Sequence, residues 1–543
     1  MRRLTLPVAL FVALACAASA AASPVFVMRG HGWGHGVGMS QWGAYGLARG
    51  YAVDHPYTWQ EIIAHYFANT STGTQSSNVS VLLVDSSGSV KVGTAFRVKA
   101  GSRSVKHHGT STVSKTSTGR IKVSGIKGTF ASPARFRPTA GHLALNSRRY
   151  RGAFVVSAVG GGVRVVNGLG VDAYVRGVVT NESPASWGDV RAHAALEAQA
   201  VAARSYALWT VAHGGGKCGG HLCPDTRDQV YGGFGSETQN GSEAVKSTLG
   251  KVVLSGGSVA ETFFSSSSGG RTAASVDTWG GNVSYLQSVT DPADLNPDNP
   301  NRSWNVRLTP RALANKLGSP RLPIDAVVTQ RASGRAAAVK LTQPGWSKTF
   351  SGGPEHFRFA LGVRSSLFAL GVLNIVPATT QTVCGGRLSL DVLARNVPNV
   401  TLQSRRTSGG TWMNRTAIST DRATVVDRPC RGTTYRLQSP SATGGNVAVQ
   451  VAPRIAFRST QPAGGVALRG FVKPVRLAGE AVYVSRKRMD GTWHRVATAT
   501  VKDDGSWRAE FNAIEGTYRA RVSPPASSGL VRGISAPFSF TLH

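Results

Sequence analysis

The stretch that decides the fold reads Gly30-His31-Gly32-Trp33-Gly34-His35-Gly36-Val37-Gly38-Met39-Ser40-Gln41-Trp42-Gly43-Ala44-Tyr45-Gly46. Glycine occupies every second position at its start, with two histidines, a Ser-Gln pair and aromatic residues among the glycines. Glycine at this density permits positive φ angles and a close approach of backbone to backbone or ligand, at an entropic cost. The stretch therefore predicts tight loops that display their polar side chains to a ligand.

Four further blocks are as distinctive as the first. They are Val166-Val-Asn-Gly-Leu-Gly-Val-Asp-Ala-Tyr174-Val-Arg-Gly177-Val-Val-Thr-Asn181-Glu182-Ser183-Pro184-Ala185-Ser186-Trp187 with Ala195-Leu-Glu-Ala-Gln199-Ala-Val-Ala-Ala-Arg204-Ser-Tyr206, then Gln229-Val-Tyr231-Gly-Gly, Phe264-Ser-Ser-Ser267-Ser-Gly269-Gly270-Arg271, and Phe357-Arg-Phe-Ala-Leu-Gly362-Val-Arg-Ser365-Ser366. In this order the blocks resemble the SpoIID/LytB family of bacterial cell-wall proteins, which includes lytic transglycosylases and amidase modifiers. The resemblance spans roughly residues 28 to 370.

The order of the blocks departs from the family pattern at one place. In the family the glycine-histidine block and the helix after it close the domain, whereas here that block stands first and Tyr57-Thr-Trp59-Gln-Glu61-Ile-Ile-Ala-His65-Tyr66-Phe67 follows it. A circular permutation explains this order, because permutation is tolerated where chain termini lie close together on the surface.

The resemblance implies a catalytic role for Glu182. Glycosidic bond cleavage needs a carboxylic acid to protonate the leaving oxygen. A lytic transglycosylase works with one such acid, since the C6 hydroxyl of muramic acid attacks the anomeric carbon and leaves a 1,6-anhydro end. Glu182 is expected at an exposed strand-to-helix junction. Without the motif it would be interpreted as a helix-entry carboxylate stabilised by the helix dipole by about 0.3–1 kcal/mol, and Glu197, in mid-helix, is a weaker candidate.

A set of polar, aromatic and glycine residues in the same blocks is expected to contact the glycan. These residues are His31, Trp33, His35, Ser40, Gln41, Gln199, Arg204, Tyr206, Gln229, Tyr231, Ser267, Gly269 and Gly270. The alternative for the loop residues is a polar network that only pins the loops. An arginine beside Glu182 would lower the pKa of the acid, so Arg204 is given a supporting role. We expect no metal at the two histidines, no serine nucleophile and no cofactor.

Four cysteines outside the N-terminal segment are expected to form two disulfide bonds, Cys384 with Cys430 and Cys218 with Cys223. The second pair lies near His213 and His221, so a zinc site is the alternative there. Related proteins have a cysteine where this chain has Asp228, and this difference favours the disulfide.

The first residues suggest export and the charge suggests retention in the cell wall. Met1-Arg2-Arg3, an apolar run and Ala18-Ser19-Ala20 are typical of a signal peptide, while Cys16 offers a weaker lipoprotein interpretation. Lys and Arg number 61 against 27 Asp and Glu, giving a formal charge of +34. An exported chain with this excess meets anionic wall polymers, although the base composition of a GC-rich genome would also enrich arginine.

The predicted class is α+β, with a mixed SpoIID-like catalytic domain that contains a β-rich subdomain, followed by two all-β immunoglobulin-like sandwiches. The predicted boundaries are a signal peptide over 1–22, the SpoIID/LytB-like domain over 23–376 with its β-rich part over 75–165, a β-sandwich-like module over 377–452 and an immunoglobulin-like sandwich over 453–543. Helical patterns are expected over 188–212, where Ser186 and Asp189 suggest a capping box, and near 310–317.

Three functions fit these observations. The first is a secreted, wall-associated lytic transglycosylase acting on peptidoglycan glycan strands. The second is a non-catalytic, LytB-like amidase enhancer, and the third is a structural wall protein held by charge. Expected partners are glycan strands, and further candidates are anionic wall polymers or a cell-wall amidase. Nucleic acid and a transmembrane segment are not expected.

Overall fold

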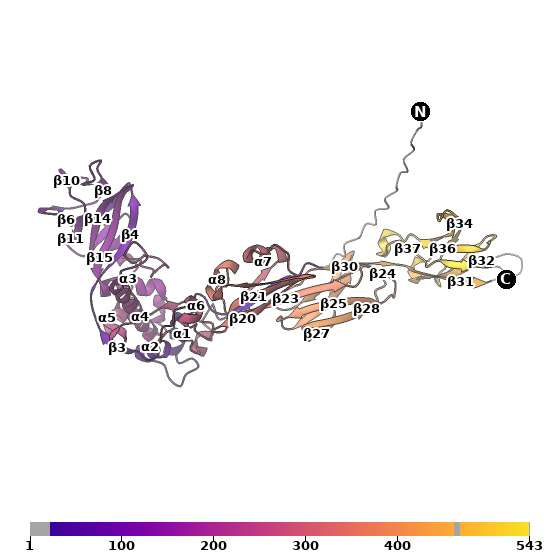
Figure 1. The fold of residues 1–543 in the computed structure, drawn as a ribbon, viewed down its shortest axis with the longest axis horizontal. Coiled ribbons are helices and arrows are strands. Elements are labelled where there is room, and N and C mark those ends of the chain that lie inside the picture. Colours follow the sequence, from indigo (N-terminus) through magenta and orange to yellow (C-terminus); the bar gives the residue numbers. More distant parts are fainter. Residues whose placement is uncertain (1–21, 461–466, 542–543) are drawn as a thin grey trace, which may run out of the picture.

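The molecule is elongated, and its sheets and helices follow one another along its length (Figure 1). The computed structural model describes residues 22–460 and 467–541, so the predicted signal peptide, apart from Ala22, lies outside the described residues, as does Cys16. Helices and mainly antiparallel sheets occur together, which confirms the α+β class. Within the described ranges no helix has the length and apolar character needed to cross a membrane.

The β-rich lobe at one end of the molecule consists of two six-stranded sheets (Figure 1). One sheet has the order β4 (Asn78–Ser87), β15 (Gly162–Gly170), β14 (Ala153–Val159), β11 (Ala134–Pro138), β6 (Phe96–Ala100) and β7 (Arg103–His107). The other has the order β10 (Thr129–Phe130), β9 (Ile121–Val123), β8 (Ser111–Lys115), β5 (Ser89–Gly93), β12 (Leu143–Leu145) and β13 (Arg148–Tyr150). Strand residues alternate between the buried face and the exposed face, so Phe96 and Phe136 are buried in the shared core while Arg97 is exposed.

A group of helices lies next to the lobe, with α4 (His193–Ala212) at its centre. Alanine-rich sequence lets α4 approach its neighbours closely, and most of its residues are buried. The helices packed against it are α1 (Gln41–Ala48), α2 (Trp59–Tyr66), α3 (Val171–Glu182) and α5 (Gln239–Ser247). Short strands complete this part: β2 (Met39–Ser40) pairs with β18 (Phe264–Ser265), and β3 (Ser71–Thr74) pairs with β16 (Lys251–Ser255), which also pairs with β17 (Ser258–Val259).

The predicted start of the long helix was wrong. Residues 185–187 form a 3-10 turn, and α4 begins at His193 after Ala192, whose side chain makes no capping bond. Asp189 instead accepts a hydrogen bond from Asn240 Nδ2 at 2.7 Å. The proposed capping pair therefore lies in the turn before the helix and not at its first residue.

A five-stranded sheet connects the helical part to the C-terminal sheets. Its order is β19 (Trp304–Leu308), β1 (Val25–Gly30), β23 (Phe368–Pro377), β25 (Leu388–Arg395) and β28 (Arg422–Asp427), so it runs across the predicted boundary at residues 376 and 377. Beside it lie α6 (Ser275–Trp279), α7 (Pro310–Leu317), α8 (Gly353–Leu361) and the hairpin sheet β20 (Asp325–Ala332), β21 (Arg335–Gln343) and β22 (Trp346–Ser351). Strand β1 thus places the glycine-rich loop that follows it beside segments more than 300 residues later in the chain.

The C-terminal part contains two regions in which sheets enclose a common core. In the first, β25 and β28 pack on β24 (Gln381–Val383), β30 (Val447–Ala452), β29 (Thr433–Gln438), β26 (Val400–Arg406) and β27 (Gly409–Ile418). In the second, β31 (Arg454–Thr460), β32 (Ala467–Lys473) and β35 (Ser506–Glu510) pack on β34 (Trp493–Thr500), β33 (Ala481–Lys487), β36 (Gly516–Val522), β37 (Gly533–Ile534) and β38 (Phe538–Phe540).

The tryptophans of these sheets differ in burial. Trp507 is buried in the second core, whereas Trp412 and Trp493 are half-buried on sheet faces. Arginines cover them: the Arg436 guanidinium lies 4.0 Å from the Trp412 ring centroid, and that of Arg519 lies 4.2 Å from the Trp493 ring. Cation–π contacts of this kind suit partly exposed rings.

Candidate active site around Glu182

Glu182 is the last residue of α3 and lies half-buried between two segments that are distant in sequence. Its Oε1 accepts a hydrogen bond from the Val230 backbone N–H at 2.7 Å, and its Oε2 accepts one from Gln41 Nε2 at 3.4 Å. Burial raises the pKa of Glu182, and the hydrogen bonds from Val230 and Gln41 oppose part of that rise. Burial therefore stabilises the protonated form of Glu182 relative to its ionised form.

The expected strand-to-helix position of Glu182 was wrong in one respect. The carboxylate stands at the C-terminal end of α3 and not at the entry to α4. The C-terminal end of a helix carries partial negative charge, which disfavours an ionised carboxylate. The helix-entry interpretation, in which the dipole would stabilise the anion, therefore does not apply.

Arg204 is bound to residues other than Glu182, which fits the supporting role expected for it. Its side chain is fully buried, and its Nε donates to Asp172 Oδ1 at 2.8 Å while Nη1 donates to the Lys251 carbonyl at 2.8 Å. Arg204 therefore joins α4 to the start of α3 and to β16. The charge of this buried guanidinium is matched by Asp172.

A chain of amides connects Glu182 to the interior of the site. Gln41 Nε2 also donates to Gln199 Oε1 at 3.4 Å, and that oxygen accepts a bond from Ser183 Oγ at 3.5 Å. The Nε2 atom of Gln199 is buried with no hydrogen-bond partner among the described residues. Gln41 is thus the predicted loop residue that reaches the acid, and Gln199 lies directly behind it.

Aromatic packing fixes α1 next to Glu182. The Trp187 ring, in the turn after α3, lies 5.1 Å from the Trp42 ring and 5.0 Å from the Tyr45 ring, measured between centroids. Trp187 and Tyr45 are buried and Trp42 is half-buried. The position of Gln41, the first residue of α1, therefore depends on the packing of Trp42 and Tyr45 against Trp187.

The glycine-rich loop after β1 is seated on the loop around Ser267. Trp33 and Ser267 exchange two backbone hydrogen bonds, at 2.8 and 3.1 Å. The glycine spacing is required by steric contact: Gly38 has φ +73°, and a Cβ there would lie 2.1 Å from the Phe263 carbonyl oxygen. At Gly36, with φ +78°, a Cβ would lie 2.1 Å from Arg335 Nη2. These glycines serve close packing of the protein with itself, which corrects the expectation that they serve ligand display.

Two buried aspartates that the sequence analysis missed hold these loops together. Asp294 accepts hydrogen bonds from Ser40 Oγ at 2.7 Å and Ser267 Oγ at 2.8 Å. Asp291 accepts bonds from Tyr66 Oη at 3.0 Å and Ser268 Oγ at 2.7 Å. Burial and the neighbouring Asp294 raise the pKa of Asp291 to about 7. Ser40 and Ser267 are buried in this network, so they brace the loops and do not face a glycan in this structure.

Three further predicted residues support the segment that contacts Glu182. Tyr206 Oη donates to Asp228 Oδ1 at 3.0 Å, and Gln229 Oε1 accepts from Tyr174 Oη at 3.0 Å. Tyr231 Oη donates to Asn167 Oδ1 at 2.9 Å. Tyr206, Gln229 and Tyr231 are buried, so these side chains hold the 228–231 segment and with it the Val230 N–H.

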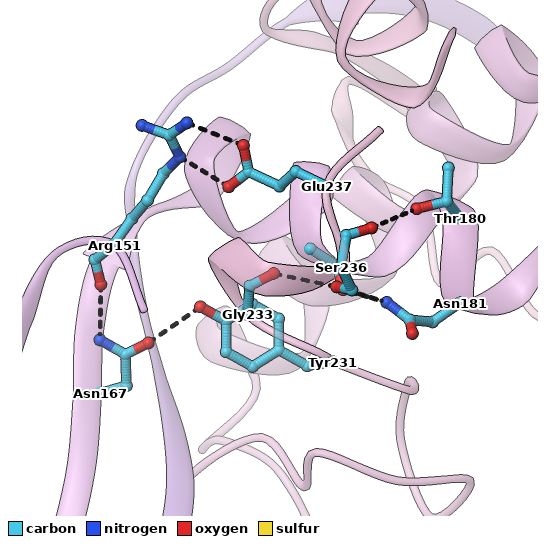
Figure 2. Close-up of polar contacts among 9 residues, drawn as sticks. Arg151, Asn167, Thr180, Asn181, Tyr231, Gly233, Ser236 and Glu237 are labelled. Carbon is cyan, nitrogen blue, oxygen red and sulfur yellow. Dashed lines mark hydrogen bonds and ion pairs between the residues drawn. The ribbon is translucent and has the colours of Figure 1, made fainter. Parts of the chain in front are cut away.

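Figure 2 shows how the continuation of this segment is tied to the lobe and to α3. Arg151 and Glu237 face each other in two hydrogen bonds of 2.6 and 2.8 Å. Asn181, which precedes Glu182, donates to Ser236 Oγ at 2.9 Å. The loop around Glu182 is therefore anchored on two sides.

An aromatic group lies beside Tyr206 and leaves one ring exposed. The Phe263 ring lies 5.7 Å from the Tyr206 ring and 4.6 Å from the ring of Trp279, which is 46% exposed. His35 packs on the same tryptophan, and burial lowers the pKa of His35 to about 4, so the imidazole is neutral. Nδ1 of His35 accepts from the Val37 N–H at 3.0 Å, which fits a loop-pinning role.

Glu261 is a second carboxyl group with a raised pKa in this region, and the sequence analysis did not single it out. Burial raises its pKa to about 7. Burial raises the pKa of the Tyr206 phenol, and the neighbouring charges of Asp228 and Glu261 raise it further. Glu261 therefore lies on the Tyr206 side of the site.

The remaining predicted residues divide by exposure. Trp33 is 51% exposed with the Arg364 guanidinium 5.3 Å from its ring, and His31 is exposed with Nδ1 2.6 Å from the Arg302 carbonyl oxygen. Gly269 and Gly270 are half-buried with positive φ angles. Of the predicted contacts, the exposed side chains available to a ligand are those of His31 and Trp33.

The four cysteines are paired in the structure. Cys218 is joined to Cys223 and Cys384 to Cys430. The Cys223 N–H also donates to Asp228 Oδ2 at 2.8 Å, so the small disulfide loop is connected to the residue that holds Tyr206.

Comparison with known proteins places this site in a family context. The family described as SpoIID, stage II sporulation protein, matches residues 159–254, which include Glu182. The chain is similar to an amidase enhancer of Bacillus subtilis (strain 168), with 33% identity over 209 residues, 37% of this chain and 27% of that protein. It is also similar to an uncharacterized protein of Brachyspira hyodysenteriae (strain ATCC 49526 / WA1), with 32% identity over 145 residues, 27% of this chain and 38% of that protein.

The chain thus spans well under two thirds of the length of these relatives. Among solved structures, a marsupial T cell receptor chain matches 29% of this chain and 69% of its own length, at 7% identity and a TM-score of 0.14. A likeness of that size carries no argument about fold or function.

Proposed function

Because this chain belongs to the SpoIID family through residues 159–254, we propose that it acts on peptidoglycan as a lytic transglycosylase with Glu182 as its catalytic acid. The observation that carries the proposal is the niche of Glu182, where burial raises the pKa of a carboxyl group whose two oxygens are separately held. General acids work best when their pKa lies near the working pH.

The proposed reaction needs one carboxyl group. Glu182 donates its proton to the glycosidic oxygen as the bond from that oxygen to the anomeric carbon breaks. The carboxylate then takes the proton of the C6 hydroxyl of the same muramic acid, whose oxygen forms the new bond to the anomeric carbon. The products are a free hydroxyl on one strand end and a 1,6-anhydro ring on the other, with no water consumed.

The geometry distinguishes the two oxygens of Glu182. Oε1 is held at 2.7 Å by the Val230 N–H, whereas the contact from Gln41 to Oε2 is long, at 3.4 Å. A short bond from a backbone donor favours charge on the oxygen that accepts it. Oε2 is therefore the oxygen that we assign to carry and return the proton.

Two partly exposed rings offer contact area for sugar rings. Trp33 lies in the glycine-rich segment, and Trp279, at the end of α6, packs on His35 of that segment. Aromatic side chains bury large apolar area while keeping their hydrogen-bonding edges free for polar groups. We assign these two rings, with His31, to glycan binding, and assign the buried residues of the predicted set to bracing.

The test is mass spectrometry of purified glycan strands, with and without stem peptides, after incubation with the wild type or with Glu182→Gln. Fragments with 1,6-anhydro-muramyl ends from the wild type and none from Glu182→Gln are expected. Glu197→Gln is the matched control, since Glu197 lies on α4 and accepts a bond from Ser247 Oγ at 2.6 Å. Equal release by the wild type and Glu182→Gln contradicts the proposal.

The second candidate function is that of a non-catalytic amidase enhancer, favoured by the name of the Bacillus subtilis relative. An enhancer binds glycan strands and stimulates a separate amidase. If neither the wild type nor Glu182→Gln releases fragments while both bind strands and stimulate an added amidase equally, this function replaces the first.

Three finer features belong to the same proposal. Export is supported by the sequence of residues 1–22. Immunoglobulin-like sandwiches over 377–452 and 453–543 are supported by the two regions in which sheets enclose a common core, and these modules would space the active site from the wall. A circular permutation is supported by the pairing of β1, which leads into the N-terminal block, with β23, which follows the Phe357–Ser366 block.

A further inference from the structure

The β-rich lobe has a charge balance unlike the rest of the chain. Residues 75–165 contain 15 Lys and Arg and one acidic residue, Asp85, while the other 452 residues contain 46 Lys and Arg and 26 Asp and Glu. Genome-wide arginine enrichment would act on all parts of the chain. The excess in the lobe is therefore a property of this lobe.

The register of the sheet gathers part of this charge on one face. Arg135 lies directly opposite Lys99, and Arg137 lies opposite Arg97, which in turn lies opposite Lys106 on β7. Opposite residues of antiparallel strands project from the same face, with Cβ atoms about 4.5–5.5 Å apart. All five side chains are exposed, whereas Phe96, Val98, Ala134 and Phe136 alternate with them on the buried face. We call these five residues the basic face.

The basic face has no counter-charge within the described chain. Asp85 is bound to Arg164, at 2.7 Å between Oδ1 and Nη2, and none of the five cations takes part in an ion pair with a described residue. Like charges directly opposite each other destabilise a sheet. A regular sheet that holds five of them side by side is suited to an anionic ligand that neutralises the face on binding.

The neighbouring positions indicate which polyanion fits. The uncharged positions of the same face include Ser104, Ala153, Val155, Ser157, Val166 and Gly168, none of which is aromatic. Proteins that bind single-stranded nucleic acid combine cations with aromatic rings on which bases stack, and duplex readers insert an element into a groove. A flat sheet of cations without rings suits a chain of phosphodiester groups that carries no bases.

The basic face continues toward the helical part of the molecule. A cavity of about 450 Å³ lies between β4, β15, β11 and the end of α4, and Arg135 is the charged residue among those that line it. The other lining residues include Ser80, Gly168 and the glycines at 214, 215 and 220. A polymer lying on the face therefore has a recess beside Arg135 into which one of its groups fits.

We propose that the basic face binds a phosphodiester polymer of the cell wall and so holds the protein at the wall. The partner class is a teichoic-acid-like polyol phosphate. This inference goes beyond the proposed cleavage and does not depend on it, because its test measures binding to a polymer that contains no glycosidic bond to muramic acid.

The test compares two variants of the chain with equal loss of charge. The basic-face variant carries Arg97→Ser, Lys99→Ser, Lys106→Ser, Arg135→Ser and Arg137→Ser. The matched control carries Ser at Lys91, Arg120, Lys122, Lys127 and Arg148, which are exposed elsewhere on the same lobe. Binding to poly(glycerol phosphate) is measured over a series of salt concentrations, with circular dichroism to show that each variant is folded.

The basic-face variant is expected to bind at least about tenfold more weakly at low salt and with a shallower salt dependence, because fewer counterions are released. The control variant is expected to stay within about twofold of the wild type, since its charges lie off the face. Equal weakening of both variants, or tighter binding of the wild type to single-stranded DNA than to poly(glycerol phosphate), overturns the proposal. Walls stripped of phosphodiester polymers by hydrofluoric acid are expected to retain less wild-type protein, and unchanged retention overturns it too.

Discussion

The niche of Glu182 and the basic face of the lobe handle charge in opposite ways. In the niche, Glu182 is half-buried and each of its two oxygens accepts a hydrogen bond, and burial raises the pKa of its carboxyl group. On the basic face, five cations are exposed and none forms an ion pair with a described residue, so their charge is available to solvent and ligand. The comparison separates the niche to which we assign proton transfer from the face to which we assign long-range attraction.

The largest expected effect separates these two tasks. Glu182→Gln removes the exchangeable proton but keeps the hydrogen-bond geometry, so the rate of glycan cleavage should fall by about 10²–10⁴-fold. Binding to whole walls should change little, because the basic face is intact. The basic-face variant should show the reverse, with cleavage of purified strands unchanged and wall binding weakened. Loss of wall binding in Glu182→Gln would show that Glu182 and the basic face do not act separately.

A matched pair of glycine substitutions tests how tightly each region is packed. Gly38→Ala places a Cβ 2.1 Å from the Phe263 carbonyl oxygen at φ +73°, so we expect a loss of about 3 kcal/mol or more in stability. Gly101→Ala, in the turn between β6 and β7 of the lobe, has φ +58° and meets no atom within 4 Å, so about 1 kcal/mol is expected. The measurement is the midpoint of urea unfolding. Equal shifts of the midpoint in the two variants would show that the loop around Gly38 moves to relieve the contact with Phe263.

The buried aspartates Asp291 and Asp294, which hold the loops around Ser40 and Ser267, make the stability of the protein depend on pH. The pKa of Asp291 is raised to about 7 in the folded protein, from 3.8, so the folded state binds the proton more tightly than the unfolded state. The stabilisation is complete below about pH 4 and is lost as pH rises through 7, by a few kcal/mol. Asp291→Asn should flatten this slope in a series of unfolding curves, while Asp85→Asn, at an exposed lobe carboxylate, should leave it in place.

Sequence motifs singled out Glu182, but its surroundings depended on contacts across the chain. Its partner Gln41 lies 141 residues away and the Val230 N–H 48 residues away. The helix α3 escaped prediction because its valines and Gly177 favour strands and turns, and only packing on α4 overrides that preference.

Other features of the fold and the site could be predicted from the sequence only in part. The alternation Phe96-Arg-Val-Lys-Ala100 predicts a half-buried strand, but strand neighbours come from sheet topology, so the juxtaposition of Arg97 and Arg137 could not be predicted. Asp291 and Asp294 join residues 225 and 254 positions away, which no local pattern encodes. The glycine spacing correctly predicted close contact of the backbone with another group, but the sequence alone does not show whether that group belongs to the protein or to a ligand.

The smallest expected effect, that of Trp279→Ala on glycan binding, differs from the effect on the basic face in its dependence on salt. Trp279 is 46% exposed and rests on Phe263 and His35, so Trp279→Ala should weaken binding to uncharged glycan strands by about tenfold, equivalent to about 1.4 kcal/mol. Contacts between rings and sugars are not screened by ions, so the loss should be the same at low and high salt, unlike the loss on the basic face. Trp412→Ala, at a half-buried tryptophan covered by Arg436, is the control and should leave glycan binding unchanged. If Trp279→Ala no longer weakens glycan binding at high salt, the ring acts through charged neighbours. The glycan site and the basic face would then both attract their ligands by charge.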